Sequence, residues 1–325
     1  MLFKFSKFFL YSTVFFVVIM TPTTLFPYIV GKYMWFRIAV DLALISFLLG
    51  LIFDARASVY LSRLRVAFHS PIVIAASAFT TAFVLAGFFG IDPAFSFWSN
   101  FERGEGGLQI LHLYVFFVLL VTLFRERREW KRILWFSLIA ALLMIGYGVG
   151  AGLKYIDAEL TTGGDLTGKG GPWFQAFANF IGPGFQESGY RFQGSIGNPA
   201  YVAAYLVFML FYTAYLFFDE SKPFHSWRSW RLVALLGIFA IFFYLAATRG
   251  AFLGLIAGGL AFLGYTGFSI KKLRIWTITG AVVVVIAAAT LINFREAPFI
   301  KSLPGARIFD ISFSTRTFGD RTTMW

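Results

Sequence analysis

Long apolar runs separated by short polar segments dominate this chain. About nine of these runs approach the roughly 20 apolar residues that a helix needs to cross the hydrocarbon core of a bilayer. They cover residues 8–30, 34–53, 71–90, 108–124, 133–152, 199–218, 232–247, 251–268 and 275–293. The pattern therefore predicts an all-α fold, a polytopic transmembrane helical bundle forming a single domain over residues 1–325.

The polar segments between the runs are of two kinds, and the difference predicts the orientation of the chain. Every second segment is short and basic, and the positive-inside rule assigns these segments to the cytoplasm together with the N-terminus. Their basic residues are Lys4, Lys7, Arg56, Arg63, Arg65, Arg125, Arg127, Arg128, Lys131, Arg132, Lys222, Arg228, Arg231, Lys271, Lys272 and Arg274. The other side then holds the outer loops 91–107 and 153–198, the second with the glycine-rich stretch TTGGDLTGKGGPW, and the start of a large extracytoplasmic loop at 294–325.

Composition agrees with a membrane protein and removes several function classes. Hydrophobic residues make up 58% of the chain, and the mean hydropathy is +0.74. With no cysteine, disulfides, thiolate nucleophiles and cysteine-bound metals are excluded. The net charge of +12 comes from short clusters between apolar runs, so it indicates topology and not a nucleic-acid partner.

Three arginines are predicted at the outer membrane surface, each near glycine. They are Arg103 in FWSNFERGEGG, Arg191 in RFQGSIGNP and Arg249 in AATRGAF. A lone arginine at an interface commonly anchors a helix by snorkelling, whereas several that converge match the oxygens of a lipid-linked phosphate or pyrophosphate. Glu102 and Glu105 flank the first arginine, where they orient a guanidinium, supply a general base, or form a solvated charge cluster.

The segment before the run at 199–218 combines a helix start with an unusual number of glycines. Asn198 followed by Pro199 is a typical helix start, with the asparagine as the cap and the proline in the first turn. Gly194 and Gly197 are predicted to leave backbone N–H groups near this helix N-terminus open to an anion.

Few ionisable residues lie inside the apolar runs. Arg37 and Asp41 are four residues apart, on one face of the second predicted helix, and are expected to form a mainly structural pair. His112 lies one turn into the fourth predicted helix, where a packing role is expected.

Taken in order, the motifs SNFERGEGG, RFQGSIGNPAYVAAYL, ATRGAFLGL and DRTTMW resemble the O-antigen ligase and O-antigen polymerase superfamily of bacterial integral-membrane glycosyltransferases. The resemblance extends over nearly the whole chain. It implies a GT-C-like membrane domain in the bacterial cytoplasmic (inner) membrane, with its active face extracytoplasmic. It also implies transfer of a glycan from an undecaprenyl-pyrophosphate carrier to a glycan, lipid or protein acceptor, without a nucleotide sugar, metal or cofactor.

The same resemblance assigns roles to particular residues. An arginine followed by Gly and Asn-Pro, a Thr-Arg-Gly turn and an Arg-x-x-x-Trp segment are matched by residues 191–199, 248–250 and 321–325. It implies that Arg191 and Arg249 are catalytic and hold the pyrophosphate. The substrate-binding residues that it implies are Arg103, Glu102, Gly194, Gly197, Asn198 and Arg321.

The chain departs from the family pattern in one respect. The base proposed for the family is a histidine downstream of Arg-x-x-x-Trp, whereas this chain stops at Trp325. We therefore expect a C-terminally truncated member that is inactive as this fragment. Two alternatives stay open at this point: a surface polysaccharide polymerase of the same superfamily, and a transporter or flippase of lipid-linked or anionic solutes.

Overall fold

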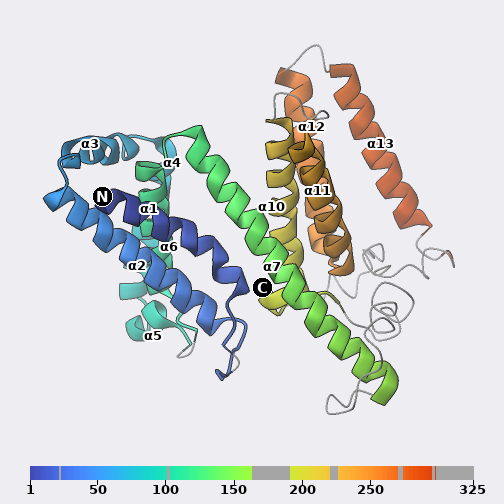
Figure 1. Ribbon diagram of the computed structural model, residues 1–325, viewed down its shortest axis with the longest axis horizontal. Helices are drawn as coiled ribbons and strands as arrows, with labels where there is room; N and C mark the ends of the chain where they lie inside the picture. The colour runs from blue at the N-terminus through green and yellow to red at the C-terminus, as the bar shows by residue number, and fades with distance from the viewer. Residues whose placement is uncertain are drawn as a thin grey trace. The chain divides into compact units, whose positions relative to one another are not determined.

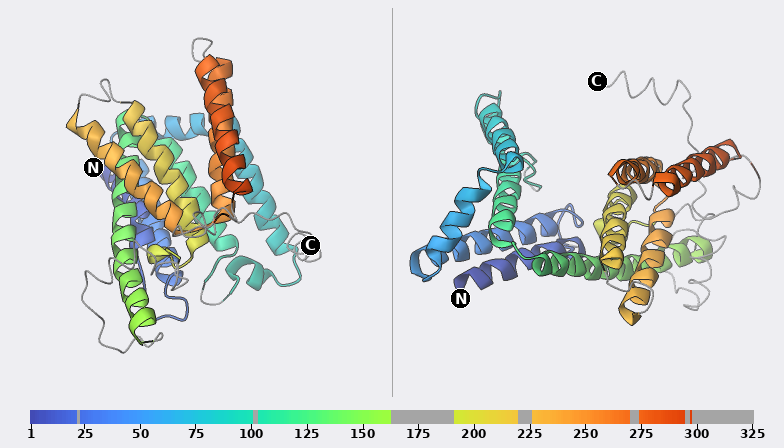
Figure 2. Two further views of the ribbon diagram at one scale, coloured as in Figure 1. Left: turned by 90° about the vertical axis from the view of Figure 1, so that its right-hand side faces the viewer. Right: turned by 90° about the horizontal axis from the view of Figure 1, so that it is seen from above.

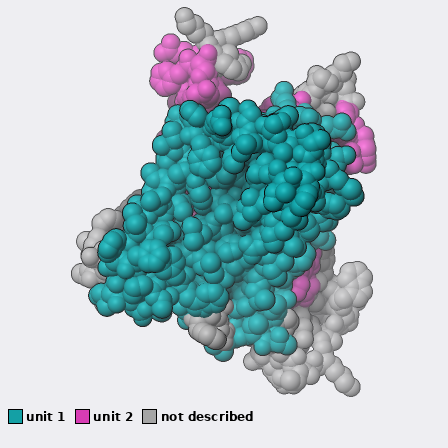
Figure 3. Space-filling view, turned by 90° about the vertical axis from the view of Figure 1, so that its left-hand side faces the viewer, with its two compact units in different colours: residues 1–144 teal, residues 145–325 magenta. Residues whose placement is uncertain are grey.

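The computed structural model describes residues 1–21, 23–100, 103–162, 191–219, 226–269, 274–294 and 297. Over these residues the regular structure is helical and contains no strand (Figure 1). The chain divides into two compact units, unit 1 over Met1–Met144 and unit 2 over Ile145–Trp325, which Figure 3 colours separately. Each unit is described by itself below, and the single domain inferred from the sequence stays a prediction.

The described helices follow the apolar runs closely. Their bounds are α1 (Leu2–Thr13), η1 (Val14–Val18), α2 (Val30–Phe53), α3 (Ala57–Ala67), α4 (Pro71–Phe88), α5 (Pro93–Trp98), α6 (Gly107–Leu123), α7 (Arg127–Thr162), η2 (Gly194–Ile196), α10 (Pro199–Phe218), α11 (Trp227–Leu245), α12 (Arg249–Ser269) and α13 (Arg274–Asn293). Six are long and apolar enough to cross a membrane: α2, α4, α7 over Arg127–Ala151, α10, α11 and α12. The protein is therefore a multi-pass helical membrane protein; α6 and Arg274–Ala287 of α13 are shorter apolar helices.

One predicted span was wrong, and one helix extends beyond its predicted span. The run 8–30 does not form one helix, because α1 begins at Leu2 and the helical path ends at Val18. The sequence TPTTLFP follows, and proline disfavours helical conformation in the residue before it. In the fifth run, the candidate membrane span of α7 ends at Ala151, as predicted, but the helix continues to Thr162, into the outer loop predicted from residue 153, because LKYIDAELTT contains neither glycine nor proline.

In unit 1, α1 and η1 run antiparallel to α2. Near one end of this pair the Ser6 hydroxyl donates to the Ala43 carbonyl at 2.8 Å, and near the other Lys32 Nζ donates to the Ile19 carbonyl at 2.7 Å. The right-hand view of Figure 2 shows the two helices side by side. The apolar core that they share with α3, α6 and the start of α7 contains Phe3, Leu10, Tyr11, Ala43, Phe47, Tyr60, Leu119, Leu123, Phe124 and Ile133.

Arg37 and Asp41 of α2 each contact α6 and do not form an ion pair with each other. Arg37 Nε donates to Gln109 Oε1 at 2.9 Å, and its Nη2 donates to the Gly104 carbonyl. Asp41 Oδ1 lies 3.2 Å from Nε2 of His112. The expected ion pair between Arg37 and Asp41 is therefore wrong, although both side chains have the structural role expected of them: they join two helices inside the membrane, where unsatisfied polar groups are costly.

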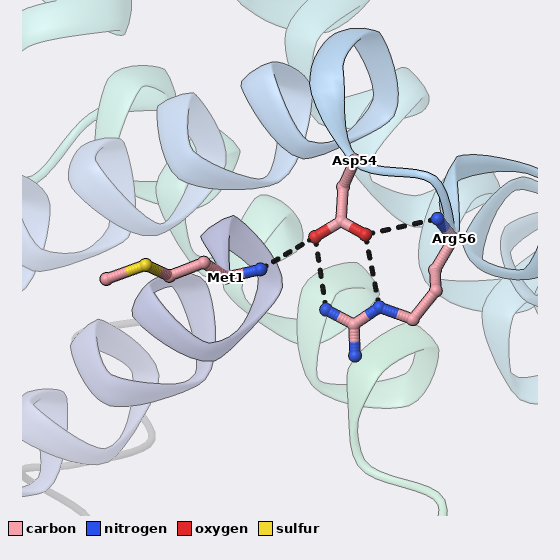
Figure 4. Close-up of polar contacts among 3 residues, drawn as sticks. All are labelled: Met1, Asp54 and Arg56. Carbon is pink, nitrogen blue, oxygen red and sulfur yellow. Dashed lines mark hydrogen bonds and ion pairs between the residues drawn. The ribbon is translucent and has the colours of Figure 1, made fainter.

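A carboxylate closes the corner between α2 and α3, as Figure 4 shows. Asp54 accepts hydrogen bonds from Arg56 Nε and Nη2, both at 3.1 Å, and from the Met1 amino group at 2.8 Å. The hydrogen bonds from the Arg56 side chain, followed by the one from the Met1 amino group, hold the pKa of Asp54 well below its usual range.

This lowered pKa predicts a pH-dependent contribution to stability. Because protonation is harder in the folded state, Asp54 stabilises the fold at neutral pH, and this contribution is lost as the pH falls through and below the value of about 3.9 for a free aspartate. Thermal unfolding of Asp54→Asn in detergent should show a deficit relative to the unsubstituted protein at neutral pH that shrinks on acidification. A deficit of constant size across that range would contradict the assignment.

In unit 2, α10 packs against α11 and α12, and α12 packs against α13. The fully buried apolar side chains include Val202 and Leu206 of α10 and Leu232 and Phe239 of α11. The start of α10 and the end of α11 lie together, because Phe192 N donates to the Leu245 carbonyl at 3.1 Å. The connections before α10 and after α11 therefore meet at one end of this unit.

Candidate functional site

The segment before α10 has the capped helix start that the sequence predicted. Asn198 is the cap, and its Oδ1 accepts from Ala200 N at 2.9 Å, with Pro199 as the first residue of the helix. Gly197 adopts a left-handed conformation, with φ of 81°, and its N–H donates to the Gln193 carbonyl at 2.9 Å. The left-handed glycine lets the chain turn from η2 into α10.

Phe192 anchors this segment in unit 2. Its side chain is fully buried, with the ring centroid 4.7 Å from that of Phe242 on α11. The backbone of Gly194 crosses α7 at Gly148, where a Cβ atom would lie 2.6 Å from the Gly194 Cα atom and 2.6 Å from the Phe192 ring. Because only a glycine leaves this space, the loop is held directly against the α7 helix.

Next to Phe192, Arg191 forms hydrogen bonds with the turn between α11 and α12. Its Nη2 donates to the carbonyls of Ala246 at 3.2 Å and Ala247 at 3.0 Å, and to the Thr248 hydroxyl at 3.0 Å. Ala247 has a φ of 46°, in the left-handed region of backbone conformation that residues other than glycine seldom adopt. The guanidinium thus stabilises a turn whose backbone is strained, and such strain persists only where the surroundings hold it.

Arg249 follows this turn directly and is the first residue of α12. The helix begins at Arg249, and Phe252 N donates to the Thr248 carbonyl at 3.1 Å. At Gly250 a Cβ atom would meet no described atom within 4 Å. The start of α12 therefore combines the partly exposed side chain of Arg249, the positive end of the helix dipole and open space beside Gly250. An anion is the kind of ligand that fits this combination.

For the predicted site residues Arg103, Glu102 and Arg321, nearness to this turn stays a prediction. Arg103 belongs to unit 1, where its guanidinium carbon lies 4.3 Å from the centroid of the Phe26 ring and its Nη1 lies 4.0 Å from Glu105 Oε2. Its predicted convergence with Arg191 and Arg249 stays a prediction. Glu102, Arg321 and the predicted loop regions 163–190 and 298–325 lie outside the described residues.

The two glycines near Arg191 act differently from the sequence prediction. The Gly197 N–H is engaged by Gln193, and Gly194 is buried against α7, so the prediction that their backbone stands open to an anion was wrong for Gly197 and does not fit the burial of Gly194. A role in substrate binding for these two residues and for Asn198 stays a prediction. The GYGVGAG stretch of α7 is typical of close helix contacts, and at Gly148 it lies directly against the backbone of Gly194.

No family model, curated protein or solved structure matches this chain. Within the described part of the chain, no group of three histidine, aspartate or glutamate residues could hold a metal ion.

Proposed function

We propose that the chain is the membrane domain of a glycosyltransferase of the O-antigen ligase type. It transfers a glycan from an undecaprenyl-pyrophosphate carrier to an acceptor hydroxyl outside the bacterial cytoplasmic membrane. The observation that supports this proposal is the contact between Arg191 and the turn that begins α12 with Arg249. One cationic residue, Arg191, thus contacts the turn directly before a second one, Arg249, although the two are far apart in the sequence.

We assign different roles to the two arginines. Because Nη2 of Arg191 is engaged by three acceptors of the turn, Arg191 is a positioning residue that fixes the shape of the turn. Arg249, at the open start of α12, is the residue assigned to the pyrophosphate itself. A guanidinium suits this task because it keeps its proton and offers paired hydrogen bonds to phosphate oxygens.

The proposed step is a substitution at the anomeric carbon of the donor sugar. The acceptor oxygen forms a bond to C1, the bond from C1 to the pyrophosphate oxygen breaks, and the electron pair leaves with the pyrophosphate. The acceptor proton passes to a base outside the described residues. Arg249 and the first N–H groups of α12 stabilise the negative charge that develops on the leaving group, and preorganised charge of this kind is a large contributor to catalysis.

The test is Arg249→Ala in the full-length protein, reconstituted in vesicles with a lipid-pyrophosphate-linked glycan and an acceptor. Glycan transfer should fall by about 10²–10³-fold, the range found when one donor that stabilises a developing anion is removed. Arg249→Lys should recover only part of the rate, because an ammonium keeps the charge but loses the paired hydrogen bonds. Transfer is followed by the gel mobility of the glycosylated acceptor.

A matched control is Arg231→Ala, which removes an exposed arginine near the opposite end of α11. It should leave transfer unchanged. Undiminished transfer by Arg249→Ala would reject the assigned role. Movement of the intact donor across the bilayer without transfer to any acceptor would reject the enzyme and favour a carrier.

A further inference from the structure

Unit 1 contains a cavity of about 930 Å³ that plays no part in the proposed transfer. It lies between α1, α2 and the first turns of α7. Its volume is at the upper end of the range of about 300–1,000 Å³ that is typical of ligand pockets. The space therefore accommodates a ligand of considerable length.

The cavity changes character along α1. Residues 4, 7, 8, 11, 12 and 15 all line it, and their spacing places them on one face of the helical segment. Lys4 and Lys7 come first on this face and Phe8 and Phe15 follow, so a charged end passes into an aromatic wall. Trp35, Ile38, Leu42 and Phe136 extend the apolar wall on α2 and α7.

The charged end carries more positive than negative side chains. Four cations, Lys4, Lys7, Arg56 and Arg132, line the cavity together with two acids, Glu126 and Glu129.

Some of these charges are already engaged within the protein. Lys7 pairs with Glu129, and Arg56 pairs with Asp54. Lys4 and Arg132 are both exposed, and neither forms an ion pair with a described carboxylate. Two exposed cations without a described carboxylate partner thus line the groove, and one of them, Arg132, also contacts the Tyr11 side chain.

The position of the groove selects the kind of ligand. α2 is long and apolar enough to span a membrane, so the wall formed by Trp35, Ile38 and Leu42 lies at the depth of the lipid chains. The charged end lies where α2 ends and α7 begins, at the level of the lipid head groups. Basic pockets between helices at this level bind anionic lipid head groups.

We propose that this groove is a binding site for an anionic phospholipid, with the phosphate at Lys4 and Arg132 and an acyl chain along the aromatic wall of α1 and α2. This proposal is independent of the glycan transfer assigned to unit 2.

The experiment titrates the purified chain in detergent with phosphatidylglycerol, phosphatidylcholine or glycerol phosphate, and native mass spectrometry counts the bound molecules. We expect one phosphatidylglycerol to bind saturably and more tightly than phosphatidylcholine. Lys4→Gln and Arg132→Gln should each weaken this binding about fivefold, the size expected for one basic residue near an anionic lipid surface. Since Arg132 also packs over the ring of Tyr11, Lys4→Gln provides a test that leaves that contact intact.

The matched control is Arg65→Gln, which removes one exposed positive charge from α3 in the same unit but outside the cavity. It should bind phosphatidylglycerol as the unsubstituted chain does. An equal loss in the control would show unspecific attraction and overturn the site. Equal binding of phosphatidylcholine would overturn the role of the charge, and displacement of the lipid by equimolar glycerol phosphate would overturn the role of the apolar wall.

Discussion

Replacing Arg191 by alanine is expected to lower the free energy of unfolding by about 1.5–3 kcal/mol, the contribution of hydrogen bonds to a charged group, and to abolish glycan transfer by the full-length protein. The reason is that Nη2 of Arg191 donates to the Ala246 and Ala247 carbonyls and to the Thr248 hydroxyl. Without the guanidinium, the Ala246 and Ala247 carbonyls of a strained turn each lose a donor, although the Thr248 hydroxyl still donates to the Ala246 carbonyl, and the start of α12 is less firmly held.

Limited trypsin digestion distinguishes this positioning role from a direct role in catalysis. A loosened turn exposes the bond after Arg249, so Arg191→Ala should be cleaved there faster than the unsubstituted protein, because local opening governs cleavage of folded chains. Thr248→Val, which removes one of the three acceptors, should have a smaller effect. Loss of transfer in Arg191→Ala with unchanged unfolding and unchanged digestion would contradict the positioning role and favour direct contact with the donor.

The helices of this protein follow from the pattern of apolar residues because a membrane helix forms its backbone hydrogen bonds locally. The run at 199–218 shows this most clearly: Asn198 caps the helix and Pro199 opens it, so the predicted and observed bounds of α10 are the same. No distant contact is needed to begin this helix.

Where the prediction was wrong, hydropathy alone gave an incomplete account. Residues 8–30 are apolar enough for one span, but the sequence TPTTLFP interrupts the helix. Within it Thr24 N donates a hydrogen bond to the Thr21 carbonyl at 3.1 Å. Arg37 and Asp41 share a helix face, as predicted, but each side chain finds a partner on α6. Such partners depend on which helices pack together. The spacing of residues along one helix does not reveal this.

The candidate site shows the same division between local and distant contacts. Glycine and arginine at residues 191–197 and 248–250 indicated that both segments were special. The contact of Arg191 with the turn at Thr248 joins residues more than fifty positions apart, and it needs Phe192 to be anchored on α11. Sequence reasoning therefore singled out both segments but did not predict the contact between them.

The second large effect is expected at Gly148, where the segment from Arg191 to Gly197 packs against α7. Gly148→Ala should lower the free energy of unfolding by about 1–3 kcal/mol, the usual cost of overpacking, because the new methyl group would lie 2.6 Å from the Gly194 Cα atom and from the Phe192 ring. The Gly194 contact is with backbone, so rotation of a side chain cannot relieve it. Transfer by the full-length protein should fall as well, since displacement of Phe192 moves Arg191 away from the turn.

Gly146→Ala is the matched control, because it makes the same change in the same helix two residues earlier, where a Cβ atom would meet no described atom within 4 Å. There the substitution should stabilise the protein by up to about 1 kcal/mol, since alanine favours helix over glycine. Unfolding of both variants, measured at equal detergent concentration, shows whether each substitution raises or lowers the free energy of unfolding. If both variants proved more stable than the unsubstituted protein, Gly148 would not be the contact that holds the Arg191 loop on α7, and the link from helix packing to the α12 turn would fail with it.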